Sequence, residues 1–182
     1  MTLNEHVWWY LSRASALVAW AALTASCTLG VLLATRVLKP HDRPAWLLAL
    51  HRHLAAIFIS LTAVHLAGLV ADGYVRFGMA ELFIPMRSVW KPGAVTVGVV
   101  ALYAAVAVQG TSLLMRKLPR RLWRAVHLLS YVSFVLVSVH AVWAGSDVRT
   151  LLFLVGASAV ATTMVLSAVV RMLHLRPARV RP

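Results

Sequence analysis

Five long stretches of the chain contain no charged residue and consist mainly of apolar side chains. They cover residues 14–35, 53–71, 92–115, 125–146 and 150–170. Each has the length of about 20 apolar residues that an α-helix needs to cover the hydrocarbon core of a bilayer. The pattern therefore predicts an all-α integral membrane protein, in which five spanning helices form one domain over residues 1–182.

The connections between these stretches are short, with one exception. Between the second and third stretches, the segment 77–85 reads Phe-Gly-Met-Ala-Glu-Leu-Phe-Ile-Pro. Its apolar residues and its terminal proline predict a short helix in the membrane interface. Hydrophobic residues make up 61% of the 182-residue chain, which leaves no room for a sizeable soluble domain. The single cysteine excludes an intramolecular disulfide and a cysteine-based metal site.

The basic residues are segregated by connection, which is a topology signal. Of the 18 lysines and arginines, 13 lie on one side of the predicted bundle. They are Arg36, Lys39, Arg43, Arg52, Arg116, Lys117, Arg120, Arg121, Arg124, Arg171, Arg176, Arg179 and Arg181. The positive-inside rule predicts that this side is cytoplasmic and that the N-terminus lies outside, in a bacterial cytoplasmic membrane. Since topology accounts for the net charge of +13, no nucleic-acid partner is predicted.

Four histidines form two matched pairs in or beside the hydrophobic stretches. His65 follows His51 at position i+14, and His140 follows His127 at position i+13. Ionisable residues within a membrane indicate a functional site. The second and fourth helices run in the same direction, so His51 and His127 form an inner layer, and His65 and His140 an outer layer about 20 Å away. A haem iron held by one imidazole from each helix has no open position, so such a site carries electrons.

Helix geometry predicts one irregularity in this arrangement. An interval of i+14 returns to within about 40° of the same helix face, whereas an interval of i+13 misses it by about 140°. We therefore predict an irregular fourth helix between His127 and His140, with a kink near Ser130–Ser133 or a π-bulge as its source. His53 could replace His51 as a ligand. We prefer His51, because its interval of i+14 to His65 fits a single helix face better.

The sequence His51-Arg52 followed by His65, and then His127 followed by His140, resembles the ferric reductase-like transmembrane domain of NADPH oxidases, ferric reductases and MsrQ. The resemblance implies that His51 and His127 hold an inner haem b and that His65 and His140 hold an outer one. The chain ends at Pro182 and none of its nine glycines forms a G-x-G-x-x-G motif. The resemblance is therefore to the stand-alone, MsrQ-like form without a flavin- and NAD(P)H-binding region.

This resemblance implies a redox subunit whose partners supply the rest of an oxidoreductase. Electrons would come from a cytoplasmic flavin reductase or from quinol, and they would leave to an exported redox partner or a metal ion. Arginines near each membrane face are candidates for binding haem propionates. Arg52 and Arg124 lie nearest the inner layer, and Arg13, Arg87 and Lys91 nearest the outer layer. Interfacial anchoring explains each of them equally well.

Two other functions stay open at this point. A transporter or proton channel would use the histidines as a relay, but it would need intramembrane acids, and no Asp or Glu lies within the five stretches. A quinol-linked cytochrome with a single haem would leave one histidine pair with a structural role.

Overall fold

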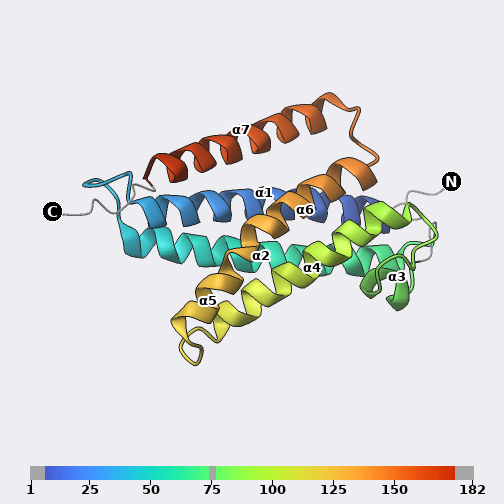
Figure 1. The fold of residues 1–182 in the computed structure, drawn as a ribbon. Helices are drawn as coiled ribbons and strands as arrows, with labels where there is room; N and C mark the ends of the chain where they lie inside the picture. The colour runs from blue at the N-terminus through green and yellow to red at the C-terminus, as the bar shows by residue number, and fades with distance from the viewer. Residues whose placement is uncertain (1–6, 74–76, 175–182) are drawn as a thin grey trace.

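The computed structural model describes residues 7–73 and 77–174, and in these ranges it consists of α-helices joined by turns and loops (Figure 1). Some charged residues of the predicted topology lie outside the described residues: Glu5, Arg76, Arg176, Arg179 and Arg181. The helices are α1 (Val7–Thr35), α2 (Pro44–Ala71), α3 (Met79–Phe83), α4 (Pro92–Leu113), α5 (Arg120–His127), α6 (Leu129–Ala144) and α7 (Leu151–His174).

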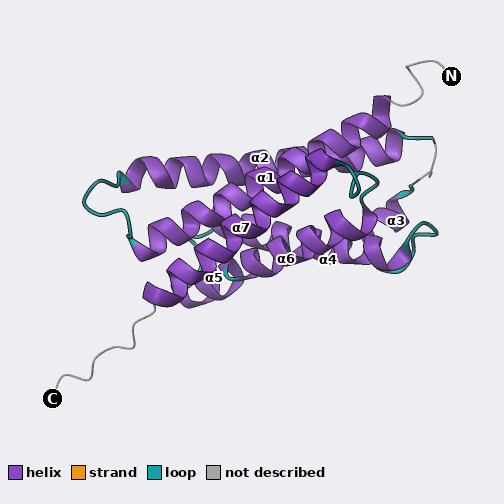
Figure 2. Cartoon of the chain, turned by 90° about the horizontal axis from the view of Figure 1, so that it is seen from above, coloured by secondary structure: helices purple, strands orange, loops and turns teal. Residues whose placement is uncertain are grey.

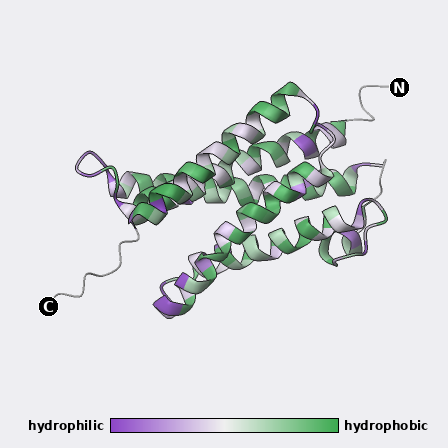
Figure 3. Cartoon of the chain, turned by 45° about the horizontal axis from the view of Figure 1, so that its top comes forward, coloured by the Kyte–Doolittle hydropathy of each residue, from purple (hydrophilic) through white to green (hydrophobic). Residues whose placement is uncertain are grey.

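Five helical segments are long and apolar enough to cross a membrane, as the sequence predicts. They are α1, α2, α4, the combined segment Arg120–Ala144, and α7. Figure 3 shows the helices as hydrophobic along most of their length, with hydrophilic residues gathered at the ends and in the connections. A helix that is apolar on all sides suits a lipid environment. The all-α, multi-pass membrane architecture is thereby confirmed.

Several helix boundaries follow from local chemistry. Proline occupies the first turn of α2 and of α4, where its missing N–H costs no hydrogen bond. The first helix begins at Val7 and therefore includes Arg13, which lies just before the predicted stretch 14–35. Arg13 is accommodated because Asp147 pairs with it. The predicted interfacial helix is present as α3, and Pro85 follows it.

The helices associate as two main pairs. Helix α1 packs along α2, α4 packs along α6, and α7 covers α1 (Figures 1 and 2). Helix α2 and the α5–α6 segment run in the same direction, as predicted, but they do not pack extensively against each other. The α1–α2 and α4–α5 connections lie at one end of the bundle, and α3 and the α6–α7 connection lie at the other. The two histidine-bearing segments therefore face each other across the centre of the bundle.

Aromatic side chains fill the core between the pairs. Trp20 stacks on Phe153 with ring centroids 6.0 Å apart, and its indole N–H donates to Ser138 Oγ at 3.0 Å. Phe58 and Phe134 are buried in the same cluster. These two phenylalanines, which lie between the inner and outer histidines in the sequence of their helices, thus pack in the core. Helices α1 and α2 approach closely at Gly68, where an added Cβ would lie 2.9 Å from Ser12 Cβ.

The fourth spanning segment is irregular, as the histidine spacing predicts, but the break lies at Leu128, upstream of Ser130–Ser133. Leu128 separates α5 from α6, and the N–H of Tyr131 donates to Leu128 O at 3.2 Å, a tighter turn than the α-helix makes. Ser133 is buried and donates to Ala101 O on α4, which fixes α6 at that level. Helix α5 contains no buried residue. The helix therefore breaks next to α5, which is less constrained by packing than α6.

Candidate cofactor-binding site

The inner pair of histidines comes together from α2 and α5. The rings of His51 and His127 have centroids 6.1 Å apart and lie at 69° to each other. Two imidazoles that ligate one metal from opposite sides, each with a bond of about 2 Å, have ring centroids about 6 Å apart. The separation of His51 and His127 fits a shared metal centre between the rings.

The outer pair lines one cavity. His65 and His140 both contribute to its wall, which is mostly apolar and includes residues of α1, α2, α4, α6 and α7. Leu82 of α3 and the nearby Phe77 and Trp90 also line it. The short helix predicted from the sequence thus contributes to the cavity that the outer histidines line. A cavity with apolar walls and few convergent polar groups is typical of a cofactor site.

Two serines of α1 support the histidines of α2 in the same way. Ser26 follows Ser12 at position i+14, the same interval as from His51 to His65. His65 Nδ1 lies 2.9 Å from both the carbonyl oxygen and the hydroxyl of Ser12, and that hydroxyl donates to His65 O at 3.1 Å. His51 makes the equivalent contacts with Ser26, at 2.9 Å to its carbonyl and 3.1 Å to its hydroxyl. The antiparallel α1–α2 pair therefore repeats one serine–histidine unit in each layer.

The histidines of the fourth span are supported by α4. His140 Nδ1 donates to Ala94 O at 2.7 Å, and its ring lies directly over Gly98. His127 Nδ1 lies 3.4 Å from Ser112 Oγ, a long contact, and the ring stacks on Trp123 with centroids 5.1 Å apart. Both rings thus turn their Nδ1 edge toward α4, although an i+13 interval in a regular helix would separate their faces. The break at Leu128 lies between them.

These contacts determine which ring nitrogen is free. A backbone carbonyl can only accept a hydrogen bond, so Nδ1 carries the proton in His51, His65 and His140. In a neutral imidazole, Nε2 then keeps its lone pair and can bind a metal. No group of three or more His, Cys, Asp or Glu side chains among the described residues is placed to hold a bare metal ion. The donor set, two imidazoles per layer, fits an iron whose other ligands belong to a porphyrin.

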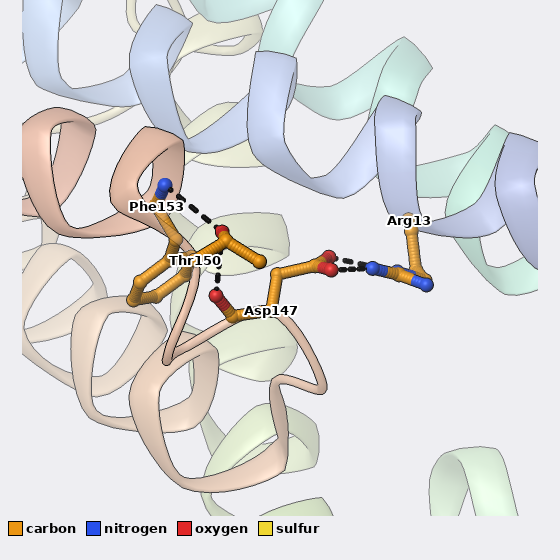
Figure 4. A network of polar contacts seen from close by, with 4 residues as sticks. All are labelled: Arg13, Asp147, Thr150 and Phe153. Atoms are coloured by element: carbon orange, nitrogen blue, oxygen red, sulfur yellow. Dashed lines mark hydrogen bonds and ion pairs between the residues drawn. The ribbon is translucent and has the colours of Figure 1, made fainter.

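The predicted arginines occupy different surroundings. Arg13 lines the outer cavity, and its Nε donates to Asp147 Oδ2 at 2.8 Å. Figure 4 shows this pair joining α1 to the α6–α7 connection, where Thr150 Oγ1 accepts the N–H of Phe153 and caps α7. Arg87 is exposed in the connection before α4 and does not line the cavity.

On the inner side, Arg52 is exposed on α2, and Arg124 lines a separate basic pocket at the α4–α5 turn. His53 is also exposed on α2, whereas His51 faces His127. The geometry therefore favours His51 over His53 as the partner of His127. Lys91 donates to Trp143 O at 3.1 Å, at the outer end of the bundle.

Sequence reasoning missed the supporting residues Ser12, Ser26, Gly98 and Asp147. A search for polar pairs at the histidine interval would have found the two serines, because their i+14 spacing is visible in the sequence. The role of Gly98 depends on the approach of α6 to α4, and no local pattern indicates it.

Comparison with known families bears directly on this arrangement. Residues 14–138 match the family model described as ferric reductase like transmembrane component. The chain belongs to this family. The match covers more than half of the chain and includes His51, His65 and His127, and His140 lies just beyond its end. No curated protein and no solved structure gave a significant match. The family and the five spanning helices identify a multi-pass membrane component of an electron-transfer system.

Proposed function

We propose that this family member is a di-haem b-type cytochrome that moves electrons from the cytoplasmic to the outer side of a bacterial cytoplasmic membrane. The observation that carries the proposal is the repeated pairing of histidines from α2 and the fourth span, with Nδ1 bonded to a backbone carbonyl of α1 or α4 at three of the four rings. A haem b in each layer would supply a one-electron carrier.

His51 and His127 are the proposed ligands of the inner iron, and His65 and His140 those of the outer iron. The carbonyls of Ser26, Ser12 and Ala94 hold three of these rings in the tautomer that leaves Nε2 unprotonated. The wall of the outer cavity is mostly apolar, and Leu82 of α3 contributes to it. Because two histidines would hold each iron, the site would exchange electrons without binding oxygen or substrate at the metal.

The proposed propionate partners are the arginines nearest each layer. Arg13 lies in the wall of the outer cavity, where its pairing with Asp147 holds the guanidinium in place. Arg52 and Arg124 are the candidates on the inner side, and Arg87 is a second candidate on the outer side. Charge-assisted hydrogen bonds from arginine suit the carboxylates of a haem.

The direction of transfer follows from the distribution of charge. The positive-inside rule puts the α1–α2 and α4–α5 connections in the cytoplasm and the N-terminus outside. A cytoplasmic flavin reductase or membrane quinol is the proposed donor, and an exported redox protein or a metal ion is the proposed acceptor. The electron path would cross from the inner to the outer histidine layer, about 20 Å along the helices.

Single alanine variants of the four histidines test this proposal. His65→Ala and His140→Ala are expected to lose the outer haem and retain the inner one, and His51→Ala and His127→Ala the reverse. Haem-to-protein ratio and redox titration of the purified variants measure the result. His53→Ala is the matched control on α2 and should retain both haems. Loss of the same haem from His51→Ala and His65→Ala in folded protein would contradict the assignment of two layers.

A further inference from the structure

A basic pocket lies at the turn between α4 and α5, apart from the four histidines. We define the basic pocket by the residues that line it: Met115, Arg116, Leu118, Arg120, Trp123 and Arg124. Arg120 and Arg124 are one helical turn apart on α5, and therefore share a face. Arg116 approaches from the end of α4. Three arginines thus line one pocket.

The backbone adds hydrogen-bond donors to the same site. Helix α5 begins at Arg120 after Pro119, and no side chain caps this end. The first bond of the helix joins Trp123 N–H to Pro119 O at 3.0 Å. The preceding N–H groups of the first turn have no acceptor within the helix, and the helix dipole places partial positive charge there. Such an end is suited to binding an anion.

Trp123 supplies a second, independent indication of a ligand. Its Nε1 atom is buried and has no hydrogen-bond partner among the described residues. A buried indole N–H usually finds an acceptor, and leaving it without one is unfavourable. The ring itself is held by stacking on His127. This atom is closed to solvent in the structure, so an acceptor bound in the basic pocket would satisfy the donor once the indole turns toward it.

The protein provides no carboxylate for these arginines in the part of the chain that the structure describes. The four described acids lie in the α1–α2 connection, at the end of α2, in α3 and in the α6–α7 connection. The acid at the same end of the bundle, Asp42, is paired with Arg36. The ligand must therefore bring its own negative charge.

The surroundings of the pocket indicate a phospholipid. Met115 and Leu118 line it, and Leu113, Leu114 and Leu122 beside it are 75%, 51% and 49% exposed. The pocket lies where two spanning segments reach the membrane boundary, at the end of the bundle that carries the basic connections. An anionic headgroup would meet the arginines while its acyl chains cover the leucines. Basic pockets between spanning helices bind acidic lipids in this manner.

We propose that the basic pocket is a binding site for the phosphate headgroup of an anionic phospholipid from the adjoining leaflet. Arg116, Arg120 and Arg124 neutralise the phosphate, and the α5 N-terminus donates hydrogen bonds to its oxygens. Trp123 Nε1 adds one when the indole turns toward the pocket. None of the four histidines lines the site, although Trp123 stacks on His127 and Arg124 is also a candidate for the inner propionates.

Native mass spectrometry of the detergent-purified chain tests the proposal with dioleoyl phosphatidylglycerol and dioleoyl phosphatidylcholine as probes. The wild type is expected to bind the phosphatidylglycerol more tightly. The double variant R116Q/R120Q should weaken its tightest binding by about 25-fold, from a loss of about five-fold for each basic residue. Trp123→Phe keeps an aromatic ring beside His127, removes the N–H, and should weaken binding several-fold. Arg124 is left unchanged because it is also a candidate for the inner propionates.

The double variant K39Q/R43Q is the matched control, because it removes two charges from the other connection at the same end of the bundle. It should change binding by less than two-fold. Equal weakening by both double variants would refute a specific site, since it would mean that general charge attracts the lipid. Binding of inorganic phosphate as tight as that of phosphatidylglycerol would overturn the lipid assignment. Loss of haem from R116Q/R120Q would instead assign the pocket to the inner haem. Unchanged lipid binding with lost binding of a cytoplasmic reductase would make it a protein-docking site.

Discussion

Replacement of Gly98 by alanine is expected to remove the outer haem and leave the inner haem in place. Gly98 lies on α4 beneath the ring of His140, and a Cβ at this position would be 2.8 Å from both Cε1 and Nδ1 of that ring. Ordinary carbon contacts begin near 3.4 Å, so the ring must withdraw by about 0.6 Å. Metal–ligand bonds tolerate about 0.2 Å. The shift is therefore large enough to weaken ligation by His140.

The fold should survive this change. Alanine is more favourable than glycine in a helix interior by about 1 kcal/mol, and overpacking typically costs about 1–3 kcal/mol. The two effects oppose each other, so the net change in the free energy of unfolding is at most about 2 kcal/mol. The hydrogen bond from His140 to Ala94 O, 2.7 Å long, limits how freely the ring can move aside. The substitution should thus affect the site more than the stability.

The assay is the haem-to-protein ratio of purified Gly98→Ala, together with redox titration of the haem that remains. Two glycine variants serve as controls. At Gly30 an added Cβ would be 3.6 Å from His51 Cε1, an ordinary contact, and at Gly110 on the same helix as Gly98 it would meet nothing within 4 Å. Both controls should retain two haems. A Gly98→Ala protein with two haems and unaltered potentials would refute the placement of His140 over Gly98 or its role as a ligand.

Three further predictions follow from the same contacts. Ser12→Ala removes the hydroxyl beside His65 Nδ1 but keeps the bond to the Ser12 carbonyl. The outer haem should be retained, and its reduction potential should rise because the imidazole becomes a weaker electron donor to the iron. Redox titration measures this potential, and an unchanged value would count against the serine–histidine unit. Ser26→Ala should change the inner potential in the same direction and leave the outer one unaltered, and a shift of both potentials in either variant would argue against independent layers. Arg13→Gln breaks the ion pair between Arg13 and Asp147, in which each side chain is 28% exposed. It should lower the melting temperature by about 2–4 °C, for a loss of about 1 kcal/mol in the free energy of unfolding. The double variant Arg13→Gln/Asp147→Asn should lower the melting temperature little further, and additive losses would show that the two residues are not coupled.

The sequence was sufficient to predict the spanning helices because their signal is local. A charge-free run of apolar residues requires no knowledge of its neighbours, and α4 and α7 lie close to the predicted stretches. Helix α2 begins at Pro44, well before its predicted stretch 53–71, because it includes the charged Arg52. The start of α1 was predicted too late, since Arg13 lies within the helix and its partner Asp147 belongs to the distant α6–α7 connection. A partner so far away in the chain leaves no local pattern.

The two histidine pairs were also predictable, because the i+14 and i+13 intervals can be counted in the sequence and the two helices run in the same direction. The conflict between the i+13 interval and regular helix geometry correctly indicated a break in the fourth span. Its position at Leu128 depends on which part of that span is held by α4, and Ser133 fixes the later part. The contacts of Gly98 and Ala94 with His140 arise from the packing of α4 on α6, which periodicity does not define.

The most direct test of the central claim is the pyridine haemochrome stoichiometry of the detergent-purified protein, together with its oxidised and dithionite-reduced spectra. Two histidine layers predict two b haems per chain with the spectrum of bis-imidazole iron. One haem per chain would contradict the second layer and leave one histidine pair with a structural role. Protein produced with an adequate haem supply that contains none would contradict the account as a whole.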